Sequence, residues 1–94
     1  MYSNIYQNIT AQMREEEKMN ELLEILNEID DTIDYNEEKH LIDDHLLDSF
    51  SIISLVGELE KTFDISIEAA EMTAENFNSA ESLWAMVQGL QEEA

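Results

Sequence analysis

The sequence predicts an all-α protein, a small antiparallel four-helix bundle of three main helices and one short helix, with a long loop between helices 1 and 2. Apolar residues recur at three- and four-residue steps in three separate stretches, the spacing of helices that bury one face. The only β-like run, "FDISI", is too short and has no partner for a sheet. The 94 residues are enough for one compact core.

The first helix is predicted over residues 14–28. Its apolar stripe follows i, i+3, i+4, i+7 and i+10 spacing: Met19, Leu22, Leu23, Leu26 and Ile29. Residues 1–12 are either a frayed tail or an extension of this helix, and Tyr2, Ile5 and Tyr6 would give them some packing. We therefore divide the chain into an N-terminal extension, 1–12, and one domain, 13–94.

Residues 30–48 form the predicted long loop, because Asp and Asn dominate this segment and interrupt the helical period. A long loop in a small domain is usually functional or held down by its own side chains. Five apolar residues are candidates to hold it: Ile33, Leu41, Ile42, Leu46 and Leu47.

The second helix is predicted over residues 49–63. Its stripe is formed by Phe50, Ile53, Val56, Leu59 and Phe63, with Ile52 and Leu55 beside them. Gly57 lies within this helix, where glycine costs about 1 kcal/mol relative to alanine. We favour a tolerated defect at Gly57 over a point of close approach to the backbone.

The rest of the chain is predicted to form short elements and a last helix. "DISIE" is an extended link, "EAAEMT" forms one or two helical turns, and "ENFNS" is a loop. The last helix covers residues 79–91, with Asn78 or Ser79 as its N-cap. Its stripe is Ala80, Leu83, Trp84, Val87 and Leu90.

The charge balance is strongly acidic, with 23 Asp and Glu against four Lys and Arg and a formal net charge of −19. Nucleic acids and anionic membranes are poor partners for such a chain, because both are bound by clustered basic residues. Basic protein surfaces are the expected partners, bound weakly and with strong salt dependence. The alternative is that acidity only maintains solubility.

Two further absences narrow the prediction. No run of about 18 apolar residues and no signal-peptide pattern is present, so we expect a cytoplasmic protein without a membrane span. The chain has no cysteine, which excludes disulfides, thiolate zinc sites and cysteine nucleophiles. Any thiol chemistry would need a thiol attached from outside.

Metal and catalytic motifs fail. In an EF-hand loop starting at Asp30, the required glycine and glutamate would be Tyr35 and Leu41. His40 and His45 have no HExxH or cysteine partner, so we interpret them as surface residues. A triad of His45 with Asp48 and Ser49 is improbable, because neighbours on one loop rarely reach triad geometry. We predict no metal and no enzymatic activity.

Ser49 has two interpretations. Asp48 or Ser49 can cap the second helix by accepting a hydrogen bond from a first-turn amide, which contributes about 1 kcal/mol. Alternatively, the Ser49 hydroxyl is a modification site, because a helix N-terminus favours a phosphate ester. Asp43, Asp44 and Asp48 oppose that phosphate locally, although they could instead hold a metal ion or the basic groups of a modifying enzyme.

Residues 18–91 resemble the acyl carrier protein family, which includes peptidyl and D-alanyl carriers. The resemblance centres on "LIDDHLLDSFSIISLVGELEKTFDISI", with an Asp-Ser-Phe signature, an amphipathic second helix and a closing Phe-x-Ile-x-Ile. "ENFNSAESLWAMV" is similar to the start of the family's final helix. Asp-Ser-Phe alone is a short motif, but its position at a helix start in an acidic four-helix pattern makes the combination specific.

The resemblance implies that Ser49 receives 4′-phosphopantetheine from coenzyme A through a phosphopantetheinyl transferase. It also implies that Asp48 helps this transferase to recognise the site. The arm supplies the missing thiol and carries acyl or aminoacyl groups as thioesters. The implied partners are this transferase, an acyl- or aminoacyl-loading ligase and downstream acyl-processing enzymes. The carrier itself is expected to be a monomer.

The resemblance also implies that the second helix supplies the docking surface. Its residues would be Phe50, Ser51, Ser54, Gly57, Glu58 and Lys61. Phe50 is also predicted to lock this helix into the core. The face is less acidic than in typical fatty-acid carriers, and "LLDSF" is more similar to stand-alone carriers of amino-acid or specialised acyl groups. The competing hypothesis is an unmodified acidic helical adaptor that binds a basic protein.

Overall fold

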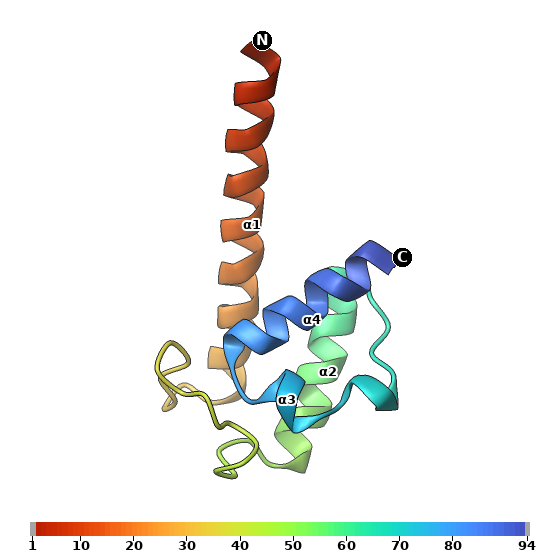
Figure 1. Ribbon diagram of the computed structural model, residues 1–94. Helices are drawn as coiled ribbons and strands as arrows, with labels where there is room; N and C mark the ends of the chain where they lie inside the picture. The colour runs from red at the N-terminus through yellow and green to blue at the C-terminus, as the bar shows by residue number, and fades with distance from the viewer. Residues whose placement is uncertain (1, 94) are drawn as a thin grey trace.

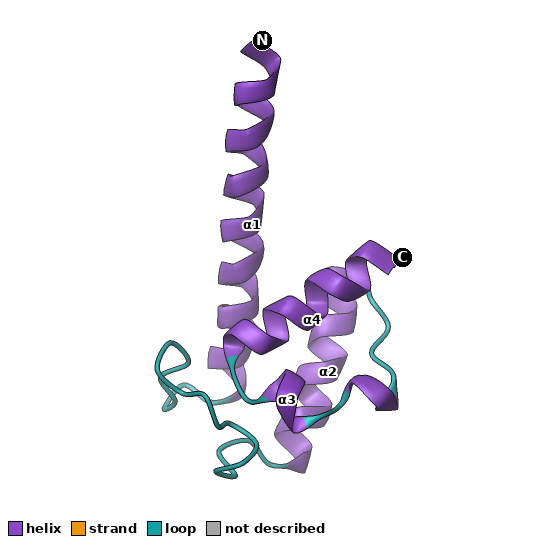
Figure 2. Ribbon diagram, in the orientation of Figure 1, coloured by secondary structure: helices purple, strands orange, loops and turns teal. Residues whose placement is uncertain are grey.

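Three long helices and two short helical elements form the protein, in a computed structural model that describes the backbone of residues 2–93 and the side chains of residues 16–92. The elements are α1 (Tyr2–Ile29), α2 (Ser49–Phe63), the 3₁₀ turn η1 (Ala69–Glu71), α3 (Ala74–Phe77) and α4 (Ala80–Glu93). Figure 2 shows that helices and loops account for the whole described chain, which confirms the predicted all-α class.

The helices surround one apolar core. α1 and α2 run antiparallel, α4 packs across both, and the short α3 leads into α4 (Figure 1). The side chains that are completely buried come from all three long helices and from the loop after α1: Leu22, Leu26, Leu41, Leu55, Leu59, Leu83 and Val87. The Phe63 and Trp84 rings meet edge to face, with their centroids 6.0 Å apart.

The first helix is longer than the predicted range of residues 14–28. α1 begins at Tyr2 and is about 42 Å long, so its N-terminal part projects beyond the bundle (Figure 1). Two alternatives were predicted for residues 1–12, a frayed tail and an extension of the first helix. From Tyr2 onward the structure shows the extension. This segment contains no proline or glycine to interrupt a helix. The packing predicted for Tyr2, Ile5 and Tyr6 lies outside the described side chains, and the domain boundary stays a prediction.

Tyr35 closes the C-terminal end of α1. Its ring is buried, and its hydroxyl lies 2.8 Å from the carbonyl oxygen of Leu26 and 2.7 Å from that of Asp30, to which it donates a shared hydrogen bond. Burial raises the pKa of Tyr35 to about 12, helped by the charges of Asp30 and Asp31. The neutral phenol therefore supplies a donor to the Asp30 carbonyl just past the helix end, and a second donor to the Leu26 carbonyl, which already accepts from the Asp30 amide.

The loop between α1 and α2 is held by most of the apolar residues predicted for it. Leu41 and Leu47 are buried, and Ile33 and Ile42 pack against the core in part. The prediction that Leu46 helps to hold the loop was wrong, because this residue is 37% exposed. The backbone reverses here, with His45 in the left-handed region at φ 57°, and Leu46 faces outward between the exposed His45 and the buried Leu47.

The inward face of α2 also corrects the prediction. Leu55, Leu59 and Phe63 are buried, with Ile52 and Val56 beside them. Phe50 and Ile53, assigned to the inward stripe, are 82% and 65% exposed. Phe50 therefore does not lock the helix into the core. The apolar residues of α2 surround more than one face, and packing against α1 and α4 selected the stripe centred on Leu55 and Leu59.

The segment after α2 differs from the prediction in one element. "DISIE" is an extended link with Ile65 and Ile67 buried, and "EAAEMT" contains the turn η1. The first three residues of "ENFNS", predicted as a loop, are helical and form the four-residue helix α3 together with Ala74. Thr73 caps α3 through its hydroxyl, which accepts a hydrogen bond from the Asn76 amide at 3.2 Å. Burial of Phe77 then fixes α3 against α4.

The start of the last helix is settled by Ser79. Its hydroxyl accepts a hydrogen bond from the Ser82 amide at 3.0 Å, so Ser79, rather than Asn78, caps α4. Within residues 2–93, no helix combines the length and the apolar character that a bilayer crossing needs.

Leu59→Ala should lower the free energy of unfolding by about 2–5 kcal/mol, because it leaves a cavity at a completely buried position. Urea unfolding followed by circular dichroism measures this. Ile53→Ala is the matched control on the same helix and should change stability by no more than about 0.5 kcal/mol. Equal losses for the two variants would contradict the corrected inward face of α2.

Candidate functional site

The candidate site lies at the first turn of α2, where Asp48 is the N-cap. The Asp48 backbone is extended, with φ −89° and ψ 179°, and its carboxylate accepts a hydrogen bond from the Ser51 amide at 2.8 Å. The first intrahelical bond follows, from the Ile52 amide to the Asp48 carbonyl at 2.9 Å. Of the two predicted capping residues, the structure uses Asp48.

The cap makes Asp48 more acidic. Hydrogen bonds from Ser51, first from its backbone and then from its side chain, hold the pKa of the Asp48 carboxyl below its usual value. The ionised form is therefore present throughout the neutral range. A negative charge at the positive end of the α2 dipole also favours the helix.

Ser49 is the first residue of α2, and its side chain is exposed. Because Asp48 supplies the cap, the Ser49 hydroxyl is not needed to hold the helix, and no hydrogen bond from it is found within residues 16–92. The Cα–Cβ bond of a helical residue keeps its direction as long as the helix is intact. The hydroxyl is therefore presented to solvent from a fixed backbone.

Asn78 fixes the loop that precedes this turn. Its carbonyl oxygen Oδ1 accepts hydrogen bonds from the amides of Ile42 and Asp43, at 3.0 and 3.1 Å. Its side-chain amide donates to the Asp43 carboxylate at 3.1 Å, and its backbone carbonyl accepts from the Leu41 amide at 2.9 Å. One residue between α3 and α4 thus holds three successive loop residues. Asn78 was predicted only as one of two alternative caps of the last helix, and no local pattern indicates its contacts with the loop.

A salt bridge supports the same loop from α4. The Lys39 ammonium donates to the Glu81 carboxylate at 2.7 Å. This hydrogen bond and the Lys39 charge hold the pKa of Glu81 below its usual value. Both side chains are largely exposed, so water and salt weaken the pair, and it adds less to the placement of the loop than Asn78 does.

The residues predicted to dock partners do share an exposed surface of α2. Phe50, Ser54, Gly57, Glu58 and Lys61 are exposed, and Ser51 is half-buried. Gly57 has no atom within 4 Å of the position that a β-carbon would take, so no close approach within the chain explains it. Ile53 adds a second large apolar side chain to this surface. Sequence reasoning missed Ile53 because it assigned that position to the core.

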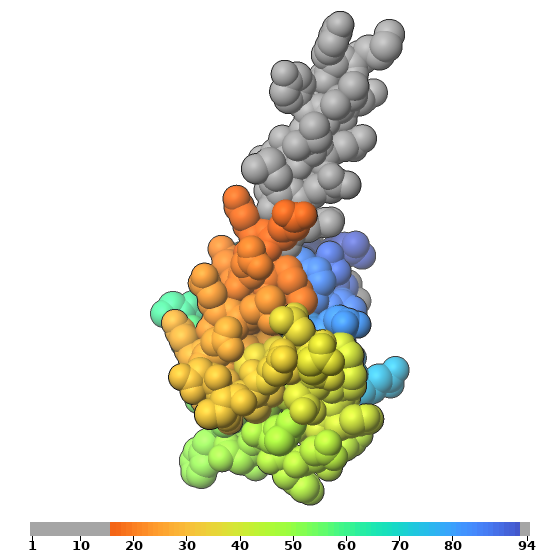
Figure 3. Space-filling model, turned by 90° about the vertical axis from the view of Figure 1, so that its left-hand side faces the viewer, coloured from red at the N-terminus to blue at the C-terminus, as the bar shows by residue number. Residues whose placement is uncertain are grey.

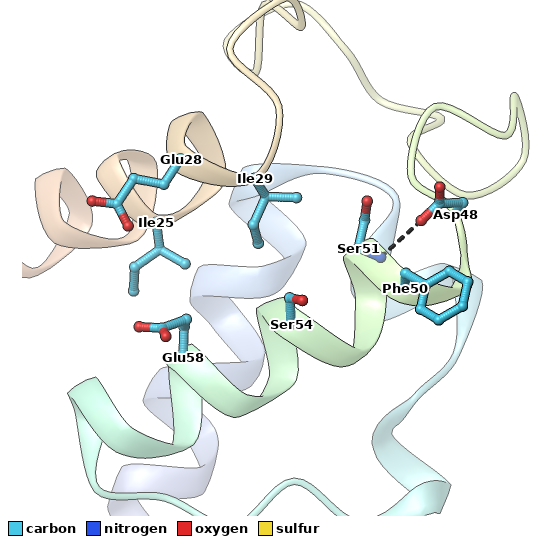
Figure 4. A pocket seen from close by; sticks show the side chains of 8 residues that line it. All are labelled: Ile25, Glu28, Ile29, Asp48, Phe50, Ser51, Ser54 and Glu58. Carbon is cyan, nitrogen blue, oxygen red and sulfur yellow. Dashed lines mark hydrogen bonds between the residues drawn. The ribbon is translucent and has the colours of Figure 1, made fainter.

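A groove of about 430 Å³ separates the start of α2 from the end of α1. Figure 4 shows Ile25, Glu28 and Ile29 on the α1 side, opposite Ser51, Ser54 and Glu58 of α2. Asp48 and Phe50, the two neighbours of Ser49, also line it. Figure 3 shows the end of α1 and the loop that follows it side by side on one face of the molecule. No pattern in the sequence indicates this groove.

The loop side chains do not form a metal centre. His40 and His45 are exposed, as predicted, and the Nδ1 atom of His40 lies 3.7 Å from the Asp43 carboxylate. Within the side chains of residues 16–92, no three His, Asp or Glu residues come together in a way that could hold a metal ion.

Curated relatives identify the family. No family model matches the chain. The D-alanyl carrier proteins of Lactococcus lactis subsp. cremoris, strains MG1363 and SK11, are each 36% identical to it over 70 residues, which is 72% of this chain and 89% of theirs. The D-alanyl carrier protein of L. lactis subsp. lactis, strain IL1403, is 33% identical over 75 residues, 78% of this chain and 95% of the relative. This chain belongs to the acyl carrier protein family.

Membership of the carrier family agrees with the helical bundle and its long first loop. The family resemblance noted in the sequence is confirmed, and the unmodified adaptor is not favoured.

Asp48→Ala should destabilise this carrier protein, whereas Ser49→Ala should leave its urea midpoint nearly unchanged, because only Asp48 caps α2. Asp48→Asn keeps a capping oxygen but cannot titrate. The folded-state pKa of Asp48 is lowered, so its ionic contribution is present above the unfolded value of about 3.9 and is lost as the pH falls through the folded value.

The stability difference between the unsubstituted protein and Asp48→Asn should therefore shrink as the pH falls from 6 to about 2.5. Urea midpoints across that range measure it. A larger loss from Ser49→Ala than from Asp48→Ala would contradict the assignment of the cap.

Proposed function

We propose that this protein carries D-alanine as a thioester on a 4′-phosphopantetheine arm attached to the Ser49 hydroxyl, and presents it to partner enzymes. The observation that carries this proposal is the exposed Ser49 at the start of α2, with the capping role taken by Asp48. The names of the relatives, all D-alanyl carrier proteins, support the cargo.

The surroundings of Ser49 fit the arm. Its hydroxyl is accessible to another enzyme and sits at the positive end of α2, which favours a phosphate ester. The carboxylates of Asp48 and of the exposed Asp43 and Asp44 oppose that phosphate electrostatically. The chain has no cysteine, and the arm would supply the thiol to which an aminoacyl group is bound.

Attachment is a phosphoryl-type transfer that a partner enzyme carries out. The Ser49 oxygen forms a bond to the pantetheine-linked phosphorus of coenzyme A, the pyrophosphate P–O bond breaks, and the nucleotide bisphosphate leaves. The hydroxyl proton passes to a base of the transferase. This chain contributes a fixed nucleophile, and the Asp48 carboxylate marks the site for the transferase.

The exposed surface of α2 is the proposed docking site for the transferase, the D-alanine-loading ligase and the enzymes that accept the cargo. It combines the apolar Phe50 with Ser51, Ser54, Gly57, Glu58 and Lys61, and Ile53 extends its apolar part. A net charge of −19 steers basic partner surfaces toward the protein and lets them exchange. Tethering then raises the effective concentration of the cargo at each partner, and the protein itself catalyses no step.

Incubation with coenzyme A and a broad-specificity phosphopantetheinyl transferase should add the mass of one phosphopantetheine to the intact protein. Ser49→Ala should abolish the gain and, since Ser49 is not the cap, should remain folded. Ser66→Ala is the matched control and should still be modified, because Ser66 is an exposed serine in the link after α2 and lies outside the docking surface. An unmodified protein in the presence of an active transferase, or modification that survives Ser49→Ala, would refute the proposal.

Phe50→Ala should raise the KM of the loading ligase for the modified carrier while leaving the urea midpoint unchanged, because the ring is 82% exposed and contributes little to the core. The affected step is docking, so kcat should change less than KM. Steady-state loading of radiolabelled D-alanine measures both constants. An unchanged KM would remove Phe50 from the docking surface.

A further inference from the structure

The groove between α1 and α2 has one end beside Ser49 and an acidic opposite end. Asp48 and Phe50 line the first end, on either side of Ser49 in the chain. Figure 4 shows Glu28 and Glu58 at the other end, one on each helix, with the Phe50 ring pointing away from α1. Ile25 and Ile29 form the apolar wall between these ends, and Ser51 and Ser54 line the α2 side.

We propose that this groove is a cargo subsite: it receives the aminoacyl end of the arm, with the cargo ammonium group between the carboxylates of Glu28 and Glu58. This inference rests on the proposed function and adds to it a place on this chain that selects an aminoacyl over a neutral acyl group. The occupant is a small α-aminoacyl thioester attached to Ser49 of the same molecule.

The position of the groove suits a tethered ligand. Glu58 lies nine residues beyond Ser49 on the same helix, which is about 13.5 Å along the helix axis. α1 runs antiparallel to α2, so Ile29 lies near the Ser49 end and Glu28 and Ile25 lie farther along (Figure 4). A flexible arm that starts at Ser49 and follows α2 therefore passes Ser51 and Ser54 before its end reaches the two glutamates.

The charges of the groove complement an amine. Glu28 from α1 and Asp48 and Glu58 from α2 are its ionisable groups, and no Lys or Arg is among its lining residues. Neither Glu28 nor Glu58 forms an ion pair within residues 16–92. An α-amino group is largely protonated at neutral pH and would pair with these carboxylates, whereas an acyl chain without the amine gains nothing from them.

The apolar wall and the hydroxyls complete the match. Ile25 and Ile29 offer contact to a small methyl group, and the hydroxyl of Ser54, one turn before Glu58, is an acceptor for a remaining ammonium proton. Holding the amine protonated also removes the lone pair with which it would attack a second thioester. The groove thus both recognises the amine and suppresses this side reaction.

Amide chemical-shift mapping of the modified protein tests the subsite. One sample carries D-alanine and the other carries isobutyrate, in which a methyl replaces the ammonium group. D-Alanine should shift the amide signals of Ile25, Glu28, Ser54 and Glu58, and isobutyrate should leave them unchanged. The double variant Glu28→Gln/Glu58→Gln should lose these shifts. Glu21→Gln/Glu24→Gln is the matched control, since it removes two exposed charges of α1 outside the groove, and should retain them.

A titration separates ion pairing from simple packing. The pKa of ¹³C-labelled D-alanine on the arm should be about 0.2–0.7 units higher than in Glu28→Gln/Glu58→Gln, the range of an exposed ion pair. Equal shifts for both cargoes, shifts confined to the first turn of α2, or an unchanged amine pKa would overturn the subsite. Because modification and loading are verified by mass beforehand, a protein that takes up no arm refutes the proposed function instead.

Discussion

The hydrogen bonds of Asn78 hold the segment before α2 in place, and the geometry at Ser49 depends on them. Ordering a loop as long as residues 30–48 costs about 1–2 kcal/mol of backbone entropy per residue. Burial of Leu41 and Leu47, the Tyr35 hydroxyl at the end of α1 and the three loop amides bound by Asn78 offset this cost. The chain therefore reaches Asp48 extended and in position to cap α2.

α2 buries one face in the core and exposes the opposite face to solvent. Leu55, Leu59 and Phe63 fill the inner face, while Phe50 and Ile53 remain exposed at a cost in solvation. Large apolar side chains grouped on the surface of a small monomeric domain are typical of a binding surface. The same helix also borders the groove toward α1, so partner docking and cargo binding would occupy two sides of one rigid element.

The high negative charge shapes how such a carrier meets its partners. With a net charge of −19 on 94 residues, the acidic side chains repel one another and destabilise the compact state. The one Lys–Glu ion pair found within residues 16–92 offsets little of this repulsion, because it is exposed. At physiological salt the field decays over about 8 Å, so it acts mainly as an approaching partner nears contact. Fast, weak association fits a protein that hands its cargo from one enzyme to another.

The sequence by itself determined the helical class, the bounds of α2, the long first loop and the exposed Ser49 at a helix start. Helical periodicity and residue types carry that information locally. The outward position of Phe50 and Ile53 could not be derived in the same way, because α2 is apolar on more than one side and only packing against α1 and α4 selects the buried face. The choice of Asp48 over Ser49 as the cap depended on the backbone angles at residue 48.

Two features were beyond the reach of the sequence. Asn78 binds residues that are 35 and 36 positions away, and the groove brings Glu28 to the same cavity as Glu58. Local propensities and spacing describe neighbours along one element, whereas these contacts join separate elements. The tertiary structure alone decided them, because they exist only once the antiparallel helices have packed and the loop has been drawn back onto α4.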